Sequence, residues 1–329
     1  MARSIQIRIK KIISLILISI FTLSVTACSS NSISVSYYDF EQEENQADVL
    51  QADISRADFY AQDLAVIPNE EWEEDEDIAA TSSLLVNRTT NEGIYADDIY
   101  DKMYPASLTK LITALVVLEQ GDPTDIVTIS YNASHILESG AKLGNFKEGD
   151  KIDLESLLNI FLIYSANDAG IALAEHISGS EEAFAEEMNK TANRLGAVHS
   201  NFINSHGLHD ENHYTTSYDL YLIFNELLNH EEFVSIINKS SITVDYTLAD
   251  GTSKTHQFMN TNRYLLGKME APENITVVGG KTGTTGAAGN CLVLYSVDNV
   301  GNEYVSIVLQ AQGGNSLYNQ MNILLEKAK

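Results

Sequence analysis

The run from Leu111 to Leu118 is apolar on nearly every side of a helix. A helix with this pattern is buried within a domain rather than laid on its surface. Pro105 stands shortly before the run, where the entrance of a helix tolerates a residue without an N–H group. The pattern therefore predicts a buried central helix that begins close to Pro105.

Shorter patterns on both sides of this helix predict strands and further helices. Short apolar or alternating runs between turn residues are typical of strands, and apolar residues three or four positions apart are typical of helices. Strands are expected over Ser82–Asn87, Ile94–Ala96, Ile242–Leu248, Ile275–Val278, Asn290–Val297 and Tyr304–Gln310, and helices over Leu154–Ile163, Ala169–His176, Glu181–Leu195, Ser217–Leu228 and Ser316–Ala328. Hairpin-length connections imply an antiparallel sheet. We therefore expect an α/β fold of the α+β type, with helices on the faces of the sheet and an all-helical lobe to one side.

The N-terminus has the features of an export signal. Four basic residues precede the apolar run Ile12–Leu23, which is too short to span a bilayer comfortably. The run leads to Val25–Cys28, where small residues before a cysteine resemble a bacterial lipobox. We predict a lipoprotein signal peptide over residues 1–27 and lipid attachment at Cys28. The alternative is an ordinary signal peptide with an incidental cysteine.

The segment that follows is polar and acidic. The whole chain has 46 acidic and 20 basic side chains, which gives a formal net charge of −26. Such a chain is repelled by nucleic acid, which is therefore excluded as a partner. We interpret residues 28–77 as a flexible acidic tether, because like charges extend a segment without hydrophobic periodicity. A cation- or partner-binding acidic arm is the alternative, and the folded domain is expected over residues 78–329.

Ser107 and Lys110 stand at the entrance of the predicted central helix. Residues three positions apart share a helix face, so a serine and a lysine are held side by side there. This arrangement suggests a nucleophile and its base. The alternative interpretation makes Ser107 an N-cap and Lys110 a surface residue. A second Ser-x-x-Lys, Ser139–Lys142, lies in a turn-like stretch with no buried helix after it.

Two further motifs follow in a fixed order. Ser165-Ala-Asn167 falls at a break between two predicted helices, where side chains can point into a cleft. Lys281-Thr282-Gly283 lies beside a predicted strand, and its glycine lets a ligand or another backbone come close. Ser-x-Asn is common by itself, but the order Ser-x-x-Lys, Ser-x-Asn and Lys-Thr-Gly on these elements is a specific signal.

With these motifs the chain resembles the serine D-alanyl-D-alanine carboxypeptidases, which are low-molecular-mass penicillin-binding proteins related to class A β-lactamases. The resemblance runs from about Thr81 to Gln312 and includes Phe202–Leu208 and Tyr214–Leu220. It implies a β-lactamase/transpeptidase-like fold and removal of the terminal D-alanine from peptidoglycan stem peptides, with β-lactams as inhibitors and no cofactor. Class A β-lactamases carry a Glu-x-x-x-Asn loop that the stretch Asp168–Ser240 lacks. The alternatives are a β-lactamase, a D,D-endopeptidase and a non-catalytic lipoprotein that senses peptidoglycan or β-lactams.

The resemblance also implies a role for each motif residue. Ser107 would be the nucleophile and Lys110 its base, with the pKa of Lys110 lowered by burial and by the charge of Lys281. Ser165 would pass a proton to the departing D-alanine amine, and Asn167 would orient Lys110 and the substrate amide. The substrate carboxylate would be bound by the third motif and the threonine that follows it, Lys281, Thr282, Gly283 and Thr284.

Three histidines in one loop, His206, His209 and His213, could hold zinc, and zinc peptidases cut the same substrate. However, His206 belongs to the stretch that carries the family resemblance, and no His-Glu-x-x-His helix exists, so no metal is expected. Cys291 lies in an apolar run and is expected to be a buried core residue. Family members often have a second β-rich domain and a C-terminal membrane helix. Neither follows here, so we expect an extracytoplasmic protein anchored to the membrane by lipid at Cys28.

Overall fold

The computed structural model describes residues 65, 67, 72, 75–138 and 140–328, all of which belong to the unit Phe59–Lys329. The predicted signal peptide, Cys28 and most of the predicted tether lie outside the described residues. Within the described ranges, none of the helices has both the length and the apolar character that a membrane span requires.

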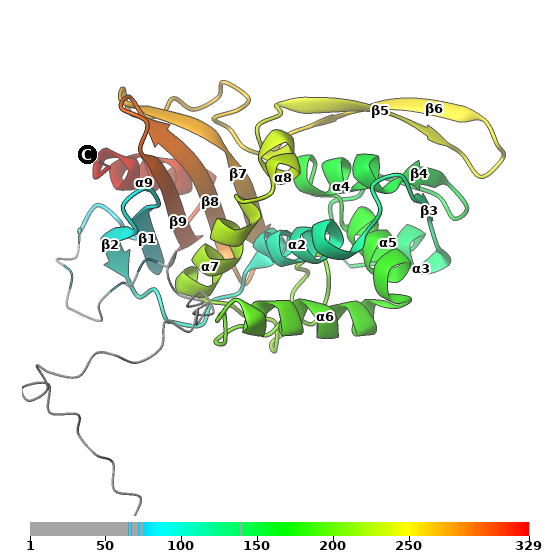
Figure 1. Ribbon diagram of the computed structural model, residues 1–329, viewed down its shortest axis with the longest axis horizontal. Helices are drawn as coiled ribbons and strands as arrows, with labels where there is room; N and C mark the ends of the chain where they lie inside the picture. The colour runs from blue at the N-terminus through cyan, green and yellow to red at the C-terminus, as the bar shows by residue number, and fades with distance from the viewer. Residues whose placement is uncertain (1–64, 66, 68–71, 73–74, 139, 329) are drawn as a thin grey trace, which may run out of the picture. The chain divides into compact units, whose positions relative to one another are not determined.

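A five-stranded antiparallel sheet, in the order β2-β1-β9-β8-β7, forms one layer of the fold (Figure 1). Its strands are β1 (Ser82–Asn87), β2 (Glu92–Asp97), β7 (Ile275–Thr285), β8 (Gly289–Asp298) and β9 (Glu303–Ala311). Successive residues of a strand point to opposite faces, and β8 uses both. Leu292 and Leu294 pack with the last helix, α9 (Gly314–Glu326), in a smaller core, whereas Val293 and the buried Cys291 join the larger core.

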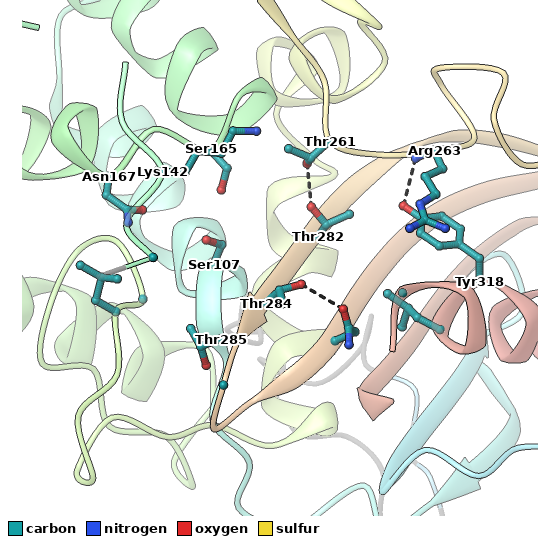
Figure 2. A pocket seen from close by; sticks show the side chains of 17 residues that line it. Ser107, Lys142, Ser165, Asn167, Thr261, Arg263, Thr282, Thr284, Thr285 and Tyr318 are labelled. Carbon is teal, nitrogen blue, oxygen red and sulfur yellow. Dashed lines mark hydrogen bonds between the residues drawn. The ribbon is translucent and has the colours of Figure 1, made fainter. Parts of the chain in front are cut away.

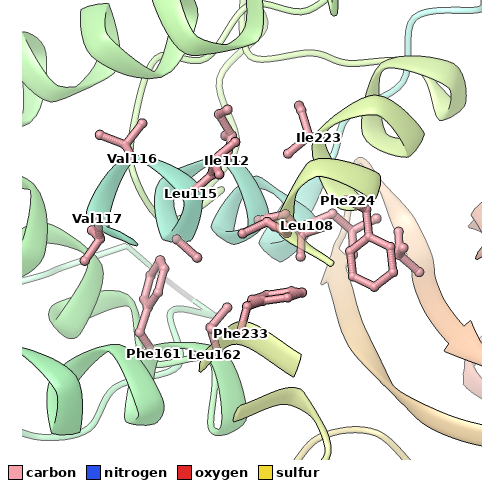
Figure 3. Packing of buried hydrophobic residues seen from close by; sticks show 14 of the residues in the cluster. Leu108, Ile112, Leu115, Val116, Val117, Phe161, Leu162, Ile223, Phe224 and Phe233 are labelled. Carbon is pink, nitrogen blue, oxygen red and sulfur yellow. The ribbon is translucent and has the colours of Figure 1, made fainter. Parts of the chain in front are cut away.

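The larger core surrounds helix α2 (Lys110–Gln120), whose residues from Lys110 to Val117 are all buried. This confirms the predicted central helix. Figure 3 shows its apolar side chains packed against Phe161, Phe224 and Phe233 of neighbouring helices. The surrounding helices are α4 (Leu154–Ile163), α5 (Asn167–Ser178), α6 (Glu181–Arg194), α7 (Ser217–Leu227) and α8 (Glu231–Ile237), with the single turn α3 (Tyr131–Ser134).

A second sheet, in the order β3-β4-β5-β6, was not expected from the sequence. Its strands are β3 (Ile126–Thr128), β4 (Lys151–Asp153), β5 (Ser241–Thr247) and β6 (Ser253–Met259). Only β5 coincides with a predicted strand. The first two strands have three residues each, too few to show an alternation. The last has Phe258 as its one buried residue, so no buried face marks it as a strand.

The domain begins earlier than the predicted boundary at Ile78. Ala65 and Ile67 are buried in the larger core, and the backbone N–H of Ala65 donates to the Tyr221 hydroxyl at 3.4 Å. Asp75 pairs with Lys327 at 2.5 Å. They belong to the run Leu64–Ile67, whose four apolar residues are too few to show a periodicity within an acidic stretch, which is why the sequence assigns them to the tether.

Candidate active site

Ser107 and Lys110 lie side by side at the start of the central helix. Ser107 is in a single 3₁₀ turn, η1 (Ala106–Thr109), and Lys110 is the first residue of α2. The lysine Nζ is 3.2 Å from the serine Oγ. Ala106 has a φ of 48°, in the left-handed region that non-glycine residues rarely occupy. The turn that presents Ser107 is therefore held in an uncommon conformation by the structure around it.

The surroundings of Lys110 favour its neutral form. The side chain is fully buried, and this burial, followed by the charge of Lys281, holds the pKa of Lys110 well below its ordinary value. Its Nζ contacts the Asn167 Oδ1 at 2.7 Å and the His206 carbonyl at 2.5 Å. A neutral amine has two N–H bonds and one lone pair. Asn167 and His206 accept both N–H bonds, which leaves the lone pair for the proton of the Ser107 hydroxyl.

The second motif lies between helices α4 and α5. Ser165 has a φ of 69°, and Asn167 begins α5. The Lys281 Nζ donates to the Ser165 Oγ at 3.0 Å and to the Thr282 carbonyl at 2.9 Å. Lys281 is buried, and this burial, together with the charge of Lys142, lowers its pKa to about 7. Each of the two motif serines therefore has its own buried lysine.

The third motif is part of strand β7, which continues past the predicted end at Val278 and pairs with β8 as far as Thr285. Glycines weaken the sequence signal of a strand, which accounts for the difference. A Cβ on Gly283 would lie 3.1 Å from the backbone nitrogen of Ser107. The glycine thus allows the strand backbone to approach η1 directly. Beside it, the hydroxyls of Thr282 and Thr261 are 2.6 Å apart.

A cavity of about 680 Å³ opens over these residues. Ser107, Ser165, Asn167, Thr282 and Thr284 line it, while Lys110 and Lys281 are buried beneath. Figure 2 shows Ser165 and Asn167 on the helical side of Ser107 and the two threonines on the strand side. The described lining residues include no aspartate or glutamate. In a chain with a net charge of −26, a pocket without acids over two lysines is suited to an anionic ligand.

The three loop histidines have other partners than a metal. The Nδ1 of His206 accepts from the Leu208 N–H at 3.1 Å, and its Nε2 faces Glu181 at 3.3 Å. His213 likewise uses Nδ1 for the Ile203 N–H and Nε2 for Thr109, and burial lowers its pKa to about 4. His209 packs edge-on against Tyr104. Among the described residues the one group with metal-ligand spacing, Glu119, Glu226 and His230, contains none of them.

The structure brings together all eight residues predicted to act on substrate, and it adds two that sequence reasoning missed. Lys142 and Arg263 both line the cavity. Lys142 belongs to the second Ser-x-x-Lys, which has no helical context in the sequence. Arg263 lies between β6 and β7 and contacts Tyr318 and Asn315 of the last helix. No local pattern marks either residue, because the cavity assembles segments that are far apart in the sequence.

Comparisons with known proteins agree with this geometry. A family model described as D-alanyl-D-alanine carboxypeptidase matches residues 69–313. The D-alanyl-D-alanine carboxypeptidase DacF of Bacillus subtilis is 35% identical over 65% of this chain and 53% of its own length. A D-alanyl-D-alanine endopeptidase of Escherichia coli is 31% identical over 71% of each chain. The chain thus spans little more than half the length of several carboxypeptidases it matches.

Solved structures share the fold. Penicillin binding protein 6B from Escherichia coli superposes with a TM-score of 0.66 at 28% identity, over 80% of each chain. A Streptomyces DD-transpeptidase superposes with a TM-score of 0.70 over 76% of this chain and 97% of its own, and its 24% identity shows the fold alone. Together with the family match over most of the domain, these findings show that the chain belongs to the D-alanyl-D-alanine carboxypeptidase family.

Proposed function

We propose that this protein is a serine D-alanyl-D-alanine carboxypeptidase, which removes the terminal D-alanine of peptidoglycan stem peptides through an acyl-enzyme. The observation that carries the proposal is the contact between Ser107 and a buried Lys110 whose pKa is lowered, at the floor of a cavity whose described lining residues include no acid. Family membership supports the substrate class.

In the acylation step, the neutral Lys110 takes the Ser107 proton as the serine Oγ attacks the carbonyl of the bond between the two D-alanines. The oxyanion lies between the backbone N–H groups of Ser107 and Thr284. The close approach of Gly283 to the Ser107 nitrogen supports this assignment. One such donor contributes about 3–4 kcal/mol to the transition state.

In the same step the peptide bond breaks, and the D-alanine amine leaves with a proton that Ser165 passes on. The contact of Ser165 with Lys281 at 3.0 Å supports this route, because the lysine can return the proton to the serine. Lys281, Thr282 and Thr284 bind the carboxylate of the chain end. Water then hydrolyses the ester and restores the Ser107 hydroxyl.

The alternatives differ in what the cavity would have to contain. A class A-like β-lactamase needs a carboxylate that activates water on the acyl-enzyme, and the described lining residues offer none. A sensor without catalytic activity has no need for a base of lowered pKa. A D,D-endopeptidase uses the same site, and the endopeptidase of Escherichia coli matches this chain over 71% of both lengths.

The test is to incubate the full-length protein with a pentapeptide ending in D-alanyl-D-alanine and with a cross-linked peptide dimer, and to measure release of D-alanine and of monomers. Release of D-alanine from the pentapeptide, absent in Ser107→Ala, is expected. Cleavage of the dimer alone would replace this proposal with the endopeptidase.

We also propose that the protein acts outside the cytoplasm, anchored by lipid at Cys28, because Val25–Cys28 resembles a lipobox. Replacement of Cys28 with alanine is expected to move the protein from the detergent phase to the aqueous phase on detergent partition, since the lipid supplies the membrane affinity. Partition unchanged by Cys28→Ala would refute lipid anchoring.

A further inference from the structure

Lys142 is a cation on the helical side of the cavity that the proposed reaction does not use. It lines the cavity on the helical side, where Figure 2 shows it beside Ser165 and Asn167 and across from Thr282 and Thr284. The proposed site for the terminal carboxylate is on the opposite, strand side. Arg263 lines the cavity on that strand side, so each side of the cavity presents a positive charge.

The loop that carries Lys142 is fixed to the active site rather than free at the surface. The Asn167 N–H donates to the Lys142 carbonyl at 2.7 Å. The buried carboxylate of Asp168 accepts the N–H groups of Gly144 and Asn145 at 2.8 and 2.9 Å. These bonds tie the loop to the first turn of α5, which carries Asn167. The backbone at Lys142 is thereby fixed beside the second motif.

The ammonium group of Lys142 is half-buried and lies 4.0 Å from the centre of the Tyr164 ring. No ion pair or hydrogen bond joins it to a carboxylate of the described residues. Burial lowers the pKa of Lys142, which reflects the cost of a cation without an anionic partner. A bound anion would offset that cost, and the aromatic ring holds the ammonium in place while leaving its N–H donors available.

We propose that Lys142 binds a second carboxylate of the substrate, carried by the side chain of the residue that precedes the two D-alanines. With the terminal carboxylate on the strand side and the scissile carbonyl at Ser107, the peptide continues toward the helical side, where Lys142 lies. The enzyme would thus prefer a stem peptide with a free acid at this residue over one in which the acid is an amide. This inference rests on the proposed function.

The experiment compares two series of peptides that end in D-alanyl-D-alanine. In one series the preceding residue has a carboxylate on a side chain of two, three or four methylene groups, and in the other the same carboxylate is a primary amide. At the best side-chain length, kcat/KM for the acid peptide is expected to be about tenfold higher than kcat/KM for the amide peptide. Lys142→Met, which keeps the contact with Tyr164, should abolish this preference.

Lys147→Met is the matched control, because Lys147 is an exposed lysine in the same loop and does not line the cavity. It removes the same charge from the protein and should keep the tenfold preference. Absence of a preference in the wild type at every length would overturn the inference. An equal loss of kcat/KM for the acid and the amide peptides in Lys142→Met would also overturn it, because a changed pKa of Lys110 or Lys281 would have that effect. If the wild type cleaves none of the peptides, the proposed function itself is wrong.

Discussion

Replacement of Lys110 with arginine is expected to slow acylation of Ser107 by about 1000-fold. Arginine keeps a positive charge at the site but cannot lose its proton at working pH, so it cannot accept the proton of the Ser107 hydroxyl. In the wild type, the acylation rate should rise with pH as Lys110 loses its proton, at a pKa well below that of an ordinary lysine. The measurement is the rate of penicillin acylation, followed by intact-protein mass spectrometry across a range of pH.

Two further variants, Lys110→Met and Lys147→Arg, serve as controls for Lys110→Arg. The methionine variant removes the amine without adding a larger cation and should be as slow as Lys110→Arg, without the rise with pH. Lys147 is exposed, and its replacement should leave the rate unchanged. Thermal unfolding of each variant verifies that the domain is folded. Acylation of the arginine variant at neutral pH within about tenfold of the wild type would exclude Lys110 as the general base.

Replacement of Gly207 with alanine is expected to destabilise the domain by about 3 kcal/mol and to lower kcat/KM by about 100-fold. Gly207 has a φ of +88°, and a Cβ there would lie 1.9 Å from the Ala106 carbonyl oxygen. Because that oxygen belongs to the turn that presents Ser107, the backbone must move where catalysis needs it fixed. Urea unfolding and peptide hydrolysis measure the two effects.

Gly179→Ala separates the clash from the cost of a left-handed backbone. Gly179 has a φ of +82°, and a Cβ there would meet nothing within 4 Å. Its replacement should cost about 1 kcal/mol and leave kcat/KM unchanged. Equal losses of stability and activity in both variants would show that the contact of Gly207 with η1 has no special importance.

The elements built on a run of buried apolar residues were predictable from the sequence. Helix α4 and strand β1 have the predicted bounds, because each contains such a run with a clear start or end. In α4 the start is Asp153, whose side chain accepts from the Ser156 N–H at the helix N-terminus. Strands β3, β4 and β6 were not predictable, since tertiary pairing rather than their own pattern makes them strands.

In the candidate site, too, residues marked by the local sequence were predictable, and residues that depend on tertiary contacts were not. The motif residues were identified because their order and their elements form a specific signal, and the structure brings them together around one cavity. Lys142 stayed unrecognised because its importance comes from the bonds that tie its loop to Asn167 and Asp168. A pairing between segments more than twenty residues apart has no signature in a single sequence.

The serine mechanism is tested most directly by mass spectrometry of the full-length protein after mixing with penicillin. The serine mechanism predicts a long-lived one-to-one adduct on the peptide that contains Ser107, with release of D-alanine blocked in proportion to its formation. The adduct persists because the leaving nitrogen stays tethered to the opened ring and obstructs water, and the described cavity offers no carboxylate to activate that water. Peptide cleavage that continues without any adduct would contradict the serine mechanism, and rapid repeated hydrolysis of penicillin would instead indicate a β-lactamase.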